Sequence, residues 1–193
     1  MLRRLVGKLL VARLQPESVR HLLPLQLGVG VKAATELIQR STQYFVDSPL
    51  FSEGEMCLVQ LDFKNAFNSV NRPKMLQELR STNPKLSPWV EFTYCKEAPL
   101  FIQGGLTITS QEGIQQGDPL APLLFSVAIN PVVRQIATQF QTEWSSWYLD
   151  DGNLISSISE VRKVMDHLLS VGPDYGLFLN SSKCQITGRS IDR

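Results

Sequence analysis

The chain has 193 residues, of which 43% are hydrophobic and 19% charged, and it carries a formal net charge of +1. This composition predicts one globular domain with at most a small appendage, and it excludes the strong overall basic field of many nucleic-acid-binding proteins. The apolar runs fall short of the roughly 18 residues that a membrane span needs, and no secretory signal is visible. The three cysteines and two histidines are scattered, which argues against a zinc site or a disulfide framework. We therefore expect an intracellular protein, nuclear or cytoplasmic.

The first fifty residues predict a helix, a loop and a second helix. Apolar positions over residues 2–14 follow the helical period, Pro24 and Gly28 mark a break, and the helical pattern resumes over 32–45. The basic start of the chain favours an amphipathic surface helix, with a transit peptide as the alternative interpretation. A short apolar run, "MCLVQLDF" (56–63), then predicts a strand buried on both faces.

The middle of the chain predicts two short helices, a hairpin and a long helix. The short helices cover residues 71–80 and 87–94, and the hairpin turns around Gly104–Gly105. Asp118 followed by Pro119 has the chemistry of an N-cap and a first helical position, so we expect the long apolar helix to begin there.

The last third of the chain predicts strands on either side of one helix. The stretch "SSWYLDDGNLISS" indicates two strands joined at Asp150, Asp151 and Gly152. An amphipathic helix follows, with Ser159 as its expected cap and Gly172 as its expected end. A final strand pair, "LFLN" and "KCQIT", completes the pattern.

The order of these elements predicts an α+β fold. With residues 71–112 treated as an insertion, the order is strand, helix, strand, strand, helix, strand, which is the ferredoxin-like βαββαβ arrangement of an antiparallel sheet with helices on one face. In this arrangement the third strand lies between the first two, so the turn after the second strand meets the end of the first. Asp62 is therefore expected beside Asp150 and Asp151 at one edge of the sheet.

Three clustered carboxylates need either raised pKa values or bound cations, because like charges repel. Hard oxygen ligands suit Mg²⁺ or Mn²⁺, and two such ions roughly 4 Å apart form the clamp of in-line phosphoryl transfer. A plain hairpin turn is the alternative interpretation of Asp-Asp-Gly, since these residues are favoured in turns. The expected pairing with Asp62 favours the metal site.

Several sequence blocks carry a resemblance to a known family. "LDFKNAFNSVNR" (61–72), "GIQQGDPLAPLLFSVAI" (113–129) and "WYLDDG" (147–152) resemble, in order and interval, the three signature blocks of reverse transcriptases. "GLFLNSSKCQI" (176–186) resembles the block that follows them in non-LTR, LINE-type retrotransposons, and "LQLGVGV" (25–31) resembles the fingers segment that precedes them. The resemblance implies a right-hand polymerase palm with partial helical fingers.

The resemblance also implies roles for single residues at the acidic edge. Asp62 and Asp150 would hold both metal ions, and Asp151 would help to position the ion that activates the primer end. Phe67 matches the family's steric gate, whose ring would clash with a 2′-hydroxyl and so favour deoxynucleotides. A core phenylalanine is the alternative interpretation of Phe67.

A nucleotide site is implied in the same way. Gln116 and Gly117 match the loop over the incoming nucleotide, and Lys183 matches a lysine proposed to protonate the leaving pyrophosphate. Arg4 lies where related enzymes carry a fingers residue that grips the triphosphate. A helix-capping loop without a ligand and a solvent-facing lysine are the plainer alternatives.

The resemblance implies partial fingers in residues 1–54 and a palm in 55–193, with a fingers-side insertion at about 71–112 and no counterpart of the thumb. The implied partners are an RNA template, a DNA primer and deoxynucleoside triphosphates, with no membrane. Such a palm is expected to bind two Mg²⁺ or Mn²⁺ ions but to extend primers poorly or not at all. The alternatives are an inactive or domesticated palm that binds nucleic acid or protein, and another palm-fold enzyme such as a nucleotide cyclase.

Overall fold

The computed structural model describes residues 2–54 and 56–188. The boundary predicted after residue 54 falls at Glu55, and this residue and the last part of the predicted palm, 189–193, lie outside the described residues. The described helices are α1 (Leu2–Leu22), α2 (Ala34–Val46), α3 (Pro49–Ser52), α4 (Ala66–Ser69), α5 (Arg72–Thr82), α6 (Ser87–Tyr94), α7 (Ala121–Gln139) and α8 (Ile158–Tyr175). The described strands are β1 (Met56–Leu61), β2 (Ala98–Phe101), β3 (Thr107–Ser110), β4 (Trp144–Tyr148), β5 (Asp151–Ser157) and β6 (Gln185–Thr187). None of these helices is long and apolar enough to span a membrane.

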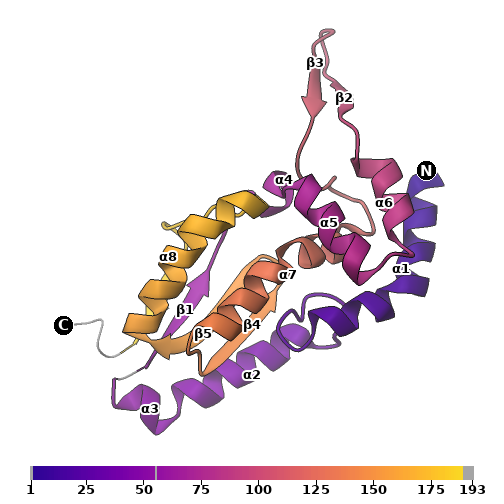
Figure 1. Ribbon diagram of the computed structural model, residues 1–193. Coiled ribbons are helices and arrows are strands. Elements are labelled where there is room, and N and C mark those ends of the chain that lie inside the picture. The colour runs from indigo at the N-terminus through magenta and orange to yellow at the C-terminus, as the bar shows by residue number, and fades with distance from the viewer. Residues whose placement is uncertain (1, 55, 189–193) are drawn as a thin grey trace.

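The central sheet has the strand order β4-β5-β1-β6 (Figure 1). β5 is antiparallel to both β4 and β1, so β1 and β4 run parallel with β5 between them. β6 pairs antiparallel with the other edge of β1. α7 precedes β4, and α8 connects β5 to β6. The βαββαβ topology predicted from the element order is confirmed.

The main core lies between the sheet and the two long helices α7 and α8. Alternate residues of β1, which are Cys57, Val59 and Leu61, belong to this core, and α7 is buried along most of its length. The opposite face of the sheet is covered in part by α2 and α3, where Leu58 packs in a smaller cluster. Gln60, the next residue on that face, is exposed. We predicted that this strand would be buried on both faces. Near its end, however, β1 is buried only on the face that packs against the main core.

The predicted insertion forms α5, α6 and a separate two-stranded sheet. β2 and β3 make the expected hairpin, with Leu100 opposite Ile108, and the hairpin projects away from the body of the molecule (Figure 1). Arg72 of α5 fixes the end of this hairpin and the chain just after it. Its guanidinium donates to the carbonyl oxygens of Ser110 and Gly113 at 2.8 Å each. The hairpin is thus anchored at its base and exposed at its tip.

The start of the long helix is shifted by two residues from the predicted one. α7 begins at Ala121 rather than at Pro119. Asp118 does act as a local acceptor, since its Oδ1 accepts the Leu120 amide proton at 2.9 Å. This bond closes a turn that ends before the first helical residue, and the carboxylate also accepts hydrogen bonds from Arg3 and Tyr94.

The predicted cap of α8 at Ser159 is wrong. Ser157 caps this helix instead, because its hydroxyl accepts the Glu160 amide proton at 3.3 Å while its own backbone is extended. Ser157 is also the last residue of β5, so the strand passes into the helix without a loop between them.

The predicted end of α8 at Gly172 is also wrong. The helix continues to Tyr175 and ends at Gly176, whose φ of 77° is the left-handed conformation of a helix C-terminus. Gly172 is needed for space rather than for termination, since a Cβ there would lie 2.7 Å from the Leu177 carbonyl oxygen.

The predicted strand over residues 177–180 does not form. A single bridge joins Leu179 to Phe63, and the Asn180 amide donates to the Asp62 carbonyl at 2.9 Å. Residues 177–180 lie alongside the chain that follows β1. Because that chain leaves the sheet after Leu61, it does not offer a strand edge long enough for these residues to pair with.

Candidate active site

Three acids meet at one rim of the central sheet. β1 and β5 pair in a register that sets Leu61 opposite Gly152. Asp62 follows Leu61 directly, and at the same end of the sheet Asp150 lies in the turn before β5 and Asp151 is the first residue of that strand. The structure thus brings together the three acids that the topology predicted to be neighbours.

No described basic side chain neutralises this rim. Among the described residues, no ion pair involves Asp62, Asp150 or Asp151. Partial burial, followed by the charges of neighbouring acids, raises the pKa of Asp151 above its ordinary value. Burial and the charge of Asp62 raise the pKa of Asp150 in the same way, against a backbone hydrogen bond that lowers it. The acids at the rim therefore have no basic partner in the described part of the chain.

The rim offers one buried carboxylate oxygen to a divalent cation. Oδ1 of Asp62 is buried and has no hydrogen-bond partner among the described residues. A buried carboxylate oxygen is costly without a donor or a cation, and carboxylates are ligands that Mg²⁺ and Mn²⁺ prefer. In the described ranges, no group of three or more histidine, cysteine, aspartate or glutamate side chains is placed to hold a metal ion. Mg²⁺ usually takes further ligands from water and substrate phosphates.

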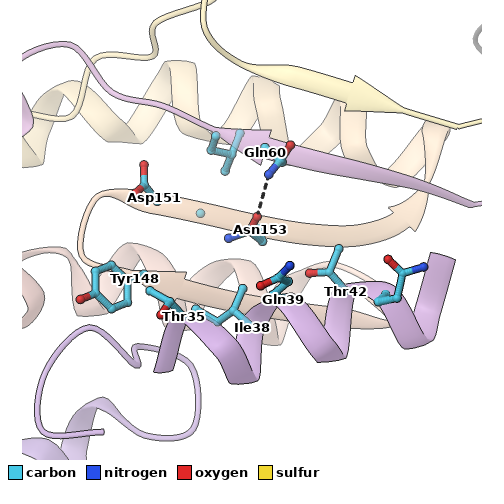
Figure 2. Close-up of a pocket in the computed structure, with 11 residues that line it drawn as sticks. Thr35, Ile38, Gln39, Thr42, Gln60, Tyr148, Asp151 and Asn153 are labelled. Atoms are coloured by element: carbon cyan, nitrogen blue, oxygen red, sulfur yellow. Dashed lines mark hydrogen bonds between the residues drawn. The ribbon is translucent and has the colours of Figure 1, made fainter. Parts of the chain in front are cut away.

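A groove of about 510 Å³ begins at the rim and runs between α2 and the sheet (Figure 2). Asp151 lies at one end, and further along Gln60 donates through Nε2 to Oδ1 of Asn153 at 3.4 Å. The wall formed by α2 is mostly polar and includes Thr35, Gln39, Thr42 and Gln43. Apart from Asp151 the lining is uncharged, so the groove offers neutral hydrogen-bonding groups to a ligand that reaches the acids.

The sequence "QQGD" (115–118) forms a tight turn ahead of α7. The Asp118 amide donates to the Gln115 carbonyl oxygen at 3.2 Å, and Gly117 has a φ of 82°. A positive φ at the third residue is the requirement of a type II turn, which glycine meets without strain. Gln116 and Gly117 are exposed at the apex, where a ligand can reach them.

One buried phenol holds both ends of this turn. The Tyr94 hydroxyl donates to Oδ2 of Asp118 at 2.7 Å and accepts the Gln115 amide proton at 3.3 Å. Arg3 of α1 donates to the same Oδ2 at 2.9 Å, and the Asp118 side chain is only 5% exposed. Burial and the Asp118 carboxylate raise the pKa of Tyr94 well above its ordinary value, so the phenol keeps the proton that it donates.

Arg4 lies against the apex of the turn. A Cβ on Gly117 would come within 2.5 Å of Nη2 of Arg4. Arg4 and Lys8, one helical turn apart on α1, line an open groove together with Gly117 and Pro119. Neither cation forms an ion pair with a described residue. Two uncompensated positive charges therefore flank the turn.

Phe67 and Lys183 occupy different environments. Phe67 is half-buried in α4, and its ring stacks on Phe125 of α7 with the centroids 4.4 Å apart. Lys183 is exposed, one residue before Cys184, whose sulfur accepts the Asp62 amide proton at 3.4 Å. Packing holds the Phe67 ring in place, whereas Lys183 is brought near the rim through the backbone alone.

Three side chains that shape the site were not singled out from the sequence: Tyr94, Lys8 and Gln26, whose amide forms hydrogen bonds with the backbone of Leu149. Tyr94 and Lys8 look like ordinary residues of amphipathic helices, and no local signal distinguishes them. Gln26 is the one side chain with a polar group in "LQLGVGV", and a lone amide between apolar residues is a signal that could have found it.

The chain is similar to known proteins over most of its length. Residues 1–192 match the family model described as reverse transcriptase (RNA-dependent DNA polymerase). The retrotransposable element SLACS 132 kDa protein of Trypanosoma brucei gambiense is 23% identical over 189 residues, which are 95% of this chain and 15% of that protein. The retrovirus-related Pol polyprotein from type-1 retrotransposable element R2 of Popillia japonica is 29% identical over 84 residues, 41% of this chain and 14% of that protein. The chain thus spans a small part of the length of these relatives.

Solved structures show the same fold. Apo telomerase from Candida tropicalis matches with a TM-score of 0.64 at 14% identity, over 97% of this chain and 36% of that chain. Telomerase from Candida albicans, solved with a TWJ fragment of telomeric RNA, matches with a TM-score of 0.60 at 13% identity, over 98% and 35% of the two chains. The predicted α+β, palm-like fold is confirmed. Because the family model matches nearly every residue, the chain belongs to the reverse transcriptase family.

Proposed function

We propose that this chain is the palm, with part of the fingers in residues 1–54, of an RNA-directed DNA polymerase from a retroelement. In the proposed reaction the 3′-hydroxyl of a DNA primer attacks the α-phosphate of a deoxynucleoside triphosphate on an RNA template. A phosphodiester bond forms and pyrophosphate leaves. Membership of the family supports the reaction class, and the retrotransposon relatives support the origin.

The acidic rim would hold two Mg²⁺ or Mn²⁺ ions through Asp62 and Asp150, with Asp151 beside them. Bound there, such ions polarise the attacking hydroxyl and neutralise charge on the leaving pyrophosphate. Without cations the three acids repel the phosphates of a substrate, so nucleotide binding is expected to depend on the metal. The unpartnered Oδ1 of Asp62 and the raised pKa values of the other two acids support this role.

The turn over residues 115–118 would bind the incoming nucleotide. Gln116 and Gly117 are exposed at its apex, and Arg4 lies beside them without an acidic partner among the described residues. A guanidinium in this position suits a triphosphate, because Arg forms strong charge-assisted bonds with phosphate oxygens. Lys8 in the same groove would add a second positive charge.

Phe67 and Lys183 would act on the sugar and on the leaving group. The Phe67 ring is stacked on Phe125 and is therefore a firm wall, which suits the exclusion of a 2′-hydroxyl. The exposed Lys183 ammonium would give a proton to the departing pyrophosphate.

The observation that carries the proposal is the register of β1 and β5. It sets Leu61 opposite Gly152 and so brings Asp62 to the turn that contains Asp150 and Asp151. A chain with the same sequence blocks but a register shifted by several residues would keep the motifs and lose the shared rim.

Single-nucleotide incorporation on a primed RNA template, titrated with Mn²⁺, tests the proposal. Asp150→Asn keeps the shape of the side chain and removes its charge, and we expect it to lower incorporation by roughly a hundredfold or more, as for loss of one preorganised electrostatic group. Asp174→Asn, an exposed acid on α8, is the matched control and should incorporate like the unaltered chain. Equal incorporation by the unaltered chain and Asp150→Asn would contradict the proposal.

A non-catalytic palm that binds nucleic acid or protein is the second candidate. It is favoured by one observation, which is that no group of three or more candidate metal ligands among the described residues is placed to hold a metal ion. In this case the chain would bind an RNA–DNA duplex equally well with and without Asp150→Asn. No nucleotide would be incorporated at any Mn²⁺ concentration.

A further inference from the structure

The turn that enters β5 contains a backbone conformation that needs support. Leu149, the residue before Asp150, has a φ of 54°. This is the left-handed region, which a bulky L-residue occupies only at a cost in free energy. Such a conformation persists where contacts with the surrounding structure hold it in place. The conformation of Leu149 also sets the directions of Asp150 and Asp151, because they follow it in the chain.

The support comes from Gln26, which precedes Leu149 by 123 positions. Oε1 of Gln26 accepts the Leu149 amide proton at 2.8 Å, and Nε2 donates to the Leu149 carbonyl oxygen at 3.0 Å. One planar amide therefore satisfies both backbone groups of a single residue, as a neighbouring strand would. Gln26 is fully buried, so water does not compete for these bonds.

Gln26 is itself held on both sides. Residues 25–27 form a parallel bridge with Trp147 of β4, through backbone bonds of 2.7 and 2.8 Å. Oε1 of Gln26 also accepts the Gly28 amide proton at 3.0 Å. The backbone of Gly28 approaches so closely that a Cβ on it would lie 2.6 Å from the Leu149 nitrogen. The segment thus fits against the turn as a rigid clamp.

We propose that Gln26 is a positioning residue for the acidic turn. It holds Leu149 in the left-handed conformation and thereby aims Asp150 and Asp151 at the rim shared with Asp62. The inference rests on the proposed function, since its effect is felt in metal binding by these acids. An amide is required because it carries both a hydrogen-bond donor and an acceptor. A glutamate carboxylate lacks the donor for the Leu149 carbonyl oxygen, and methionine lacks both the amide donor and the amide acceptor.

Gln26→Met tests the proposal, because it keeps the length of the side chain and removes both hydrogen bonds. Two quantities are measured on the whole chain: hydrogen exchange of the Leu149 amide without metal, and the affinity for Mn²⁺. We expect exchange to be at least about tenfold faster and Mn²⁺ binding about tenfold weaker. Gln135→Met is the matched control, since this half-buried glutamine of α7 contacts His167, and it should change neither quantity.

Leu149→Gly, added to Gln26→Met, separates positioning from a general loss of stability. Glycine adopts the left-handed conformation without support, so the double variant should recover most of the Mn²⁺ affinity although it restores no hydrogen bond. Such recovery supports the proposal. Wild-type Mn²⁺ affinity in Gln26→Met, or a double variant that binds no better than the single one, overturns it.

Failure of the proposed function gives a different result. An unaltered chain that binds no Mn²⁺ overturns the proposed metal site, together with the part of the inference that depends on it. Exchange of the Leu149 amide still decides whether Gln26 holds the turn, because it is measured without metal.

Discussion

The turn at Leu149–Asp150 and the turn at Gln116–Gly117 are built alike and held differently. Each contains a left-handed residue, and each is fixed by one buried polar side chain from another element of the chain. Gln26 holds the first turn as a neutral amide that meets backbone groups, whereas Tyr94 holds the second through the Asp118 carboxylate. The difference teaches how a site can keep some acids available for ligands. The acids proposed to bind cations, Asp150 and Asp151, are positioned by a neutral amide, whereas Asp118, which holds a turn together, is paired with a cation and a phenol.

The left-handed residues differ as well. Gly117 adopts a φ of 82° at no steric cost, but Leu149 adopts 54° only with the support of its surroundings. The turn at Leu149–Asp150 therefore depends on the contacts that Gln26 and Gly28 make with it, while the turn at Gln116–Gly117 depends on the conformational freedom of glycine. Substitutions that act on one clamp and not on the other can break or sharpen this comparison.

The largest expected effect is that of Gly28→Ala. The added Cβ would overlap the backbone nitrogen of Leu149, which cannot move without opening the turn, so we expect a loss of about 3 kcal/mol in the free energy of unfolding. Gly117→Ala is the paired variant, with a positive φ but only the flexible end of Arg4 in the way, and it should cost about 1–2 kcal/mol. Urea unfolding measures both. A larger loss for Gly117→Ala would reverse the comparison.

Tyr94→Phe should have the next largest effect. The ring still fills its space, but Asp118 loses one donor and the Gln115 amide is left without its partner, so we expect a loss of about 2 kcal/mol. Tyr44→Phe, at a tyrosine that is 74% exposed, should stay within about 0.5 kcal/mol of the unaltered chain. If chemical denaturation finds the two variants equally stable, the phenol does not hold the turn.

Divalent metal should stabilise the chain through the acidic turn, and more at pH 7 than in acid. Folding raises the pKa of Asp150 and Asp151 above the ordinary aspartate value of about 4. At a pH between that value and the raised pKa values, the folded chain therefore binds more protons than the unfolded chain. Without metal, these two groups make stability fall as pH rises through this window. Mn²⁺ at ten times its Kd should return about 1.4 kcal/mol at pH 7 and much less below pH 4.

Asp150→Asn is the variant that checks this prediction. It should raise the thermal midpoint of the metal-free chain at pH 7, because it removes an uncompensated charge, and it should reduce the gain from Mn²⁺. Thermal unfolding at several pH values, with and without Mn²⁺, measures both effects. The same gain from Mn²⁺ in Asp150→Asn and in the unaltered chain would show that the metal binds elsewhere.

The smallest expected effect is a dependence on salt that only the turn at Gln116–Gly117 should show. Arg3→Gln removes the partly exposed cation that pairs with Asp118, and we expect a loss of about 1 kcal/mol or less at low ionic strength. The loss should be smaller in 1 M NaCl, where the Debye length is about 3 Å. The effect of Gln26→Met on stability should be the same at both salt concentrations, since its bonds are neutral and buried. Equal salt dependence for the two variants would remove the distinction between the clamps.

Local patterns predicted most of the fold and missed several of its boundaries. Strand periodicity and turn residues were enough to order the elements and to bring Asp62 to Asp150, because each is visible in a window of a few residues. The predicted end of α8 failed because Gly172 serves the close approach of a later segment, and glycine can indicate either a stop or a contact. The predicted start of α7 failed because the Asp118 carboxylate is engaged by Tyr94 and Arg3.

The sequence by itself determined the βαββαβ order and the acids at one rim, since these follow from local chemistry and from the alternation of strands. Only the tertiary structure decided which side chains hold the two turns. Gln26 reaches across 123 positions and Tyr94 across 24, and a hydrogen bond between such distant residues leaves no periodic trace in either segment. The physical reason is that a buried polar group is satisfied by whatever partner the fold brings to it, and packing of α1, α6 and the sheet makes that choice.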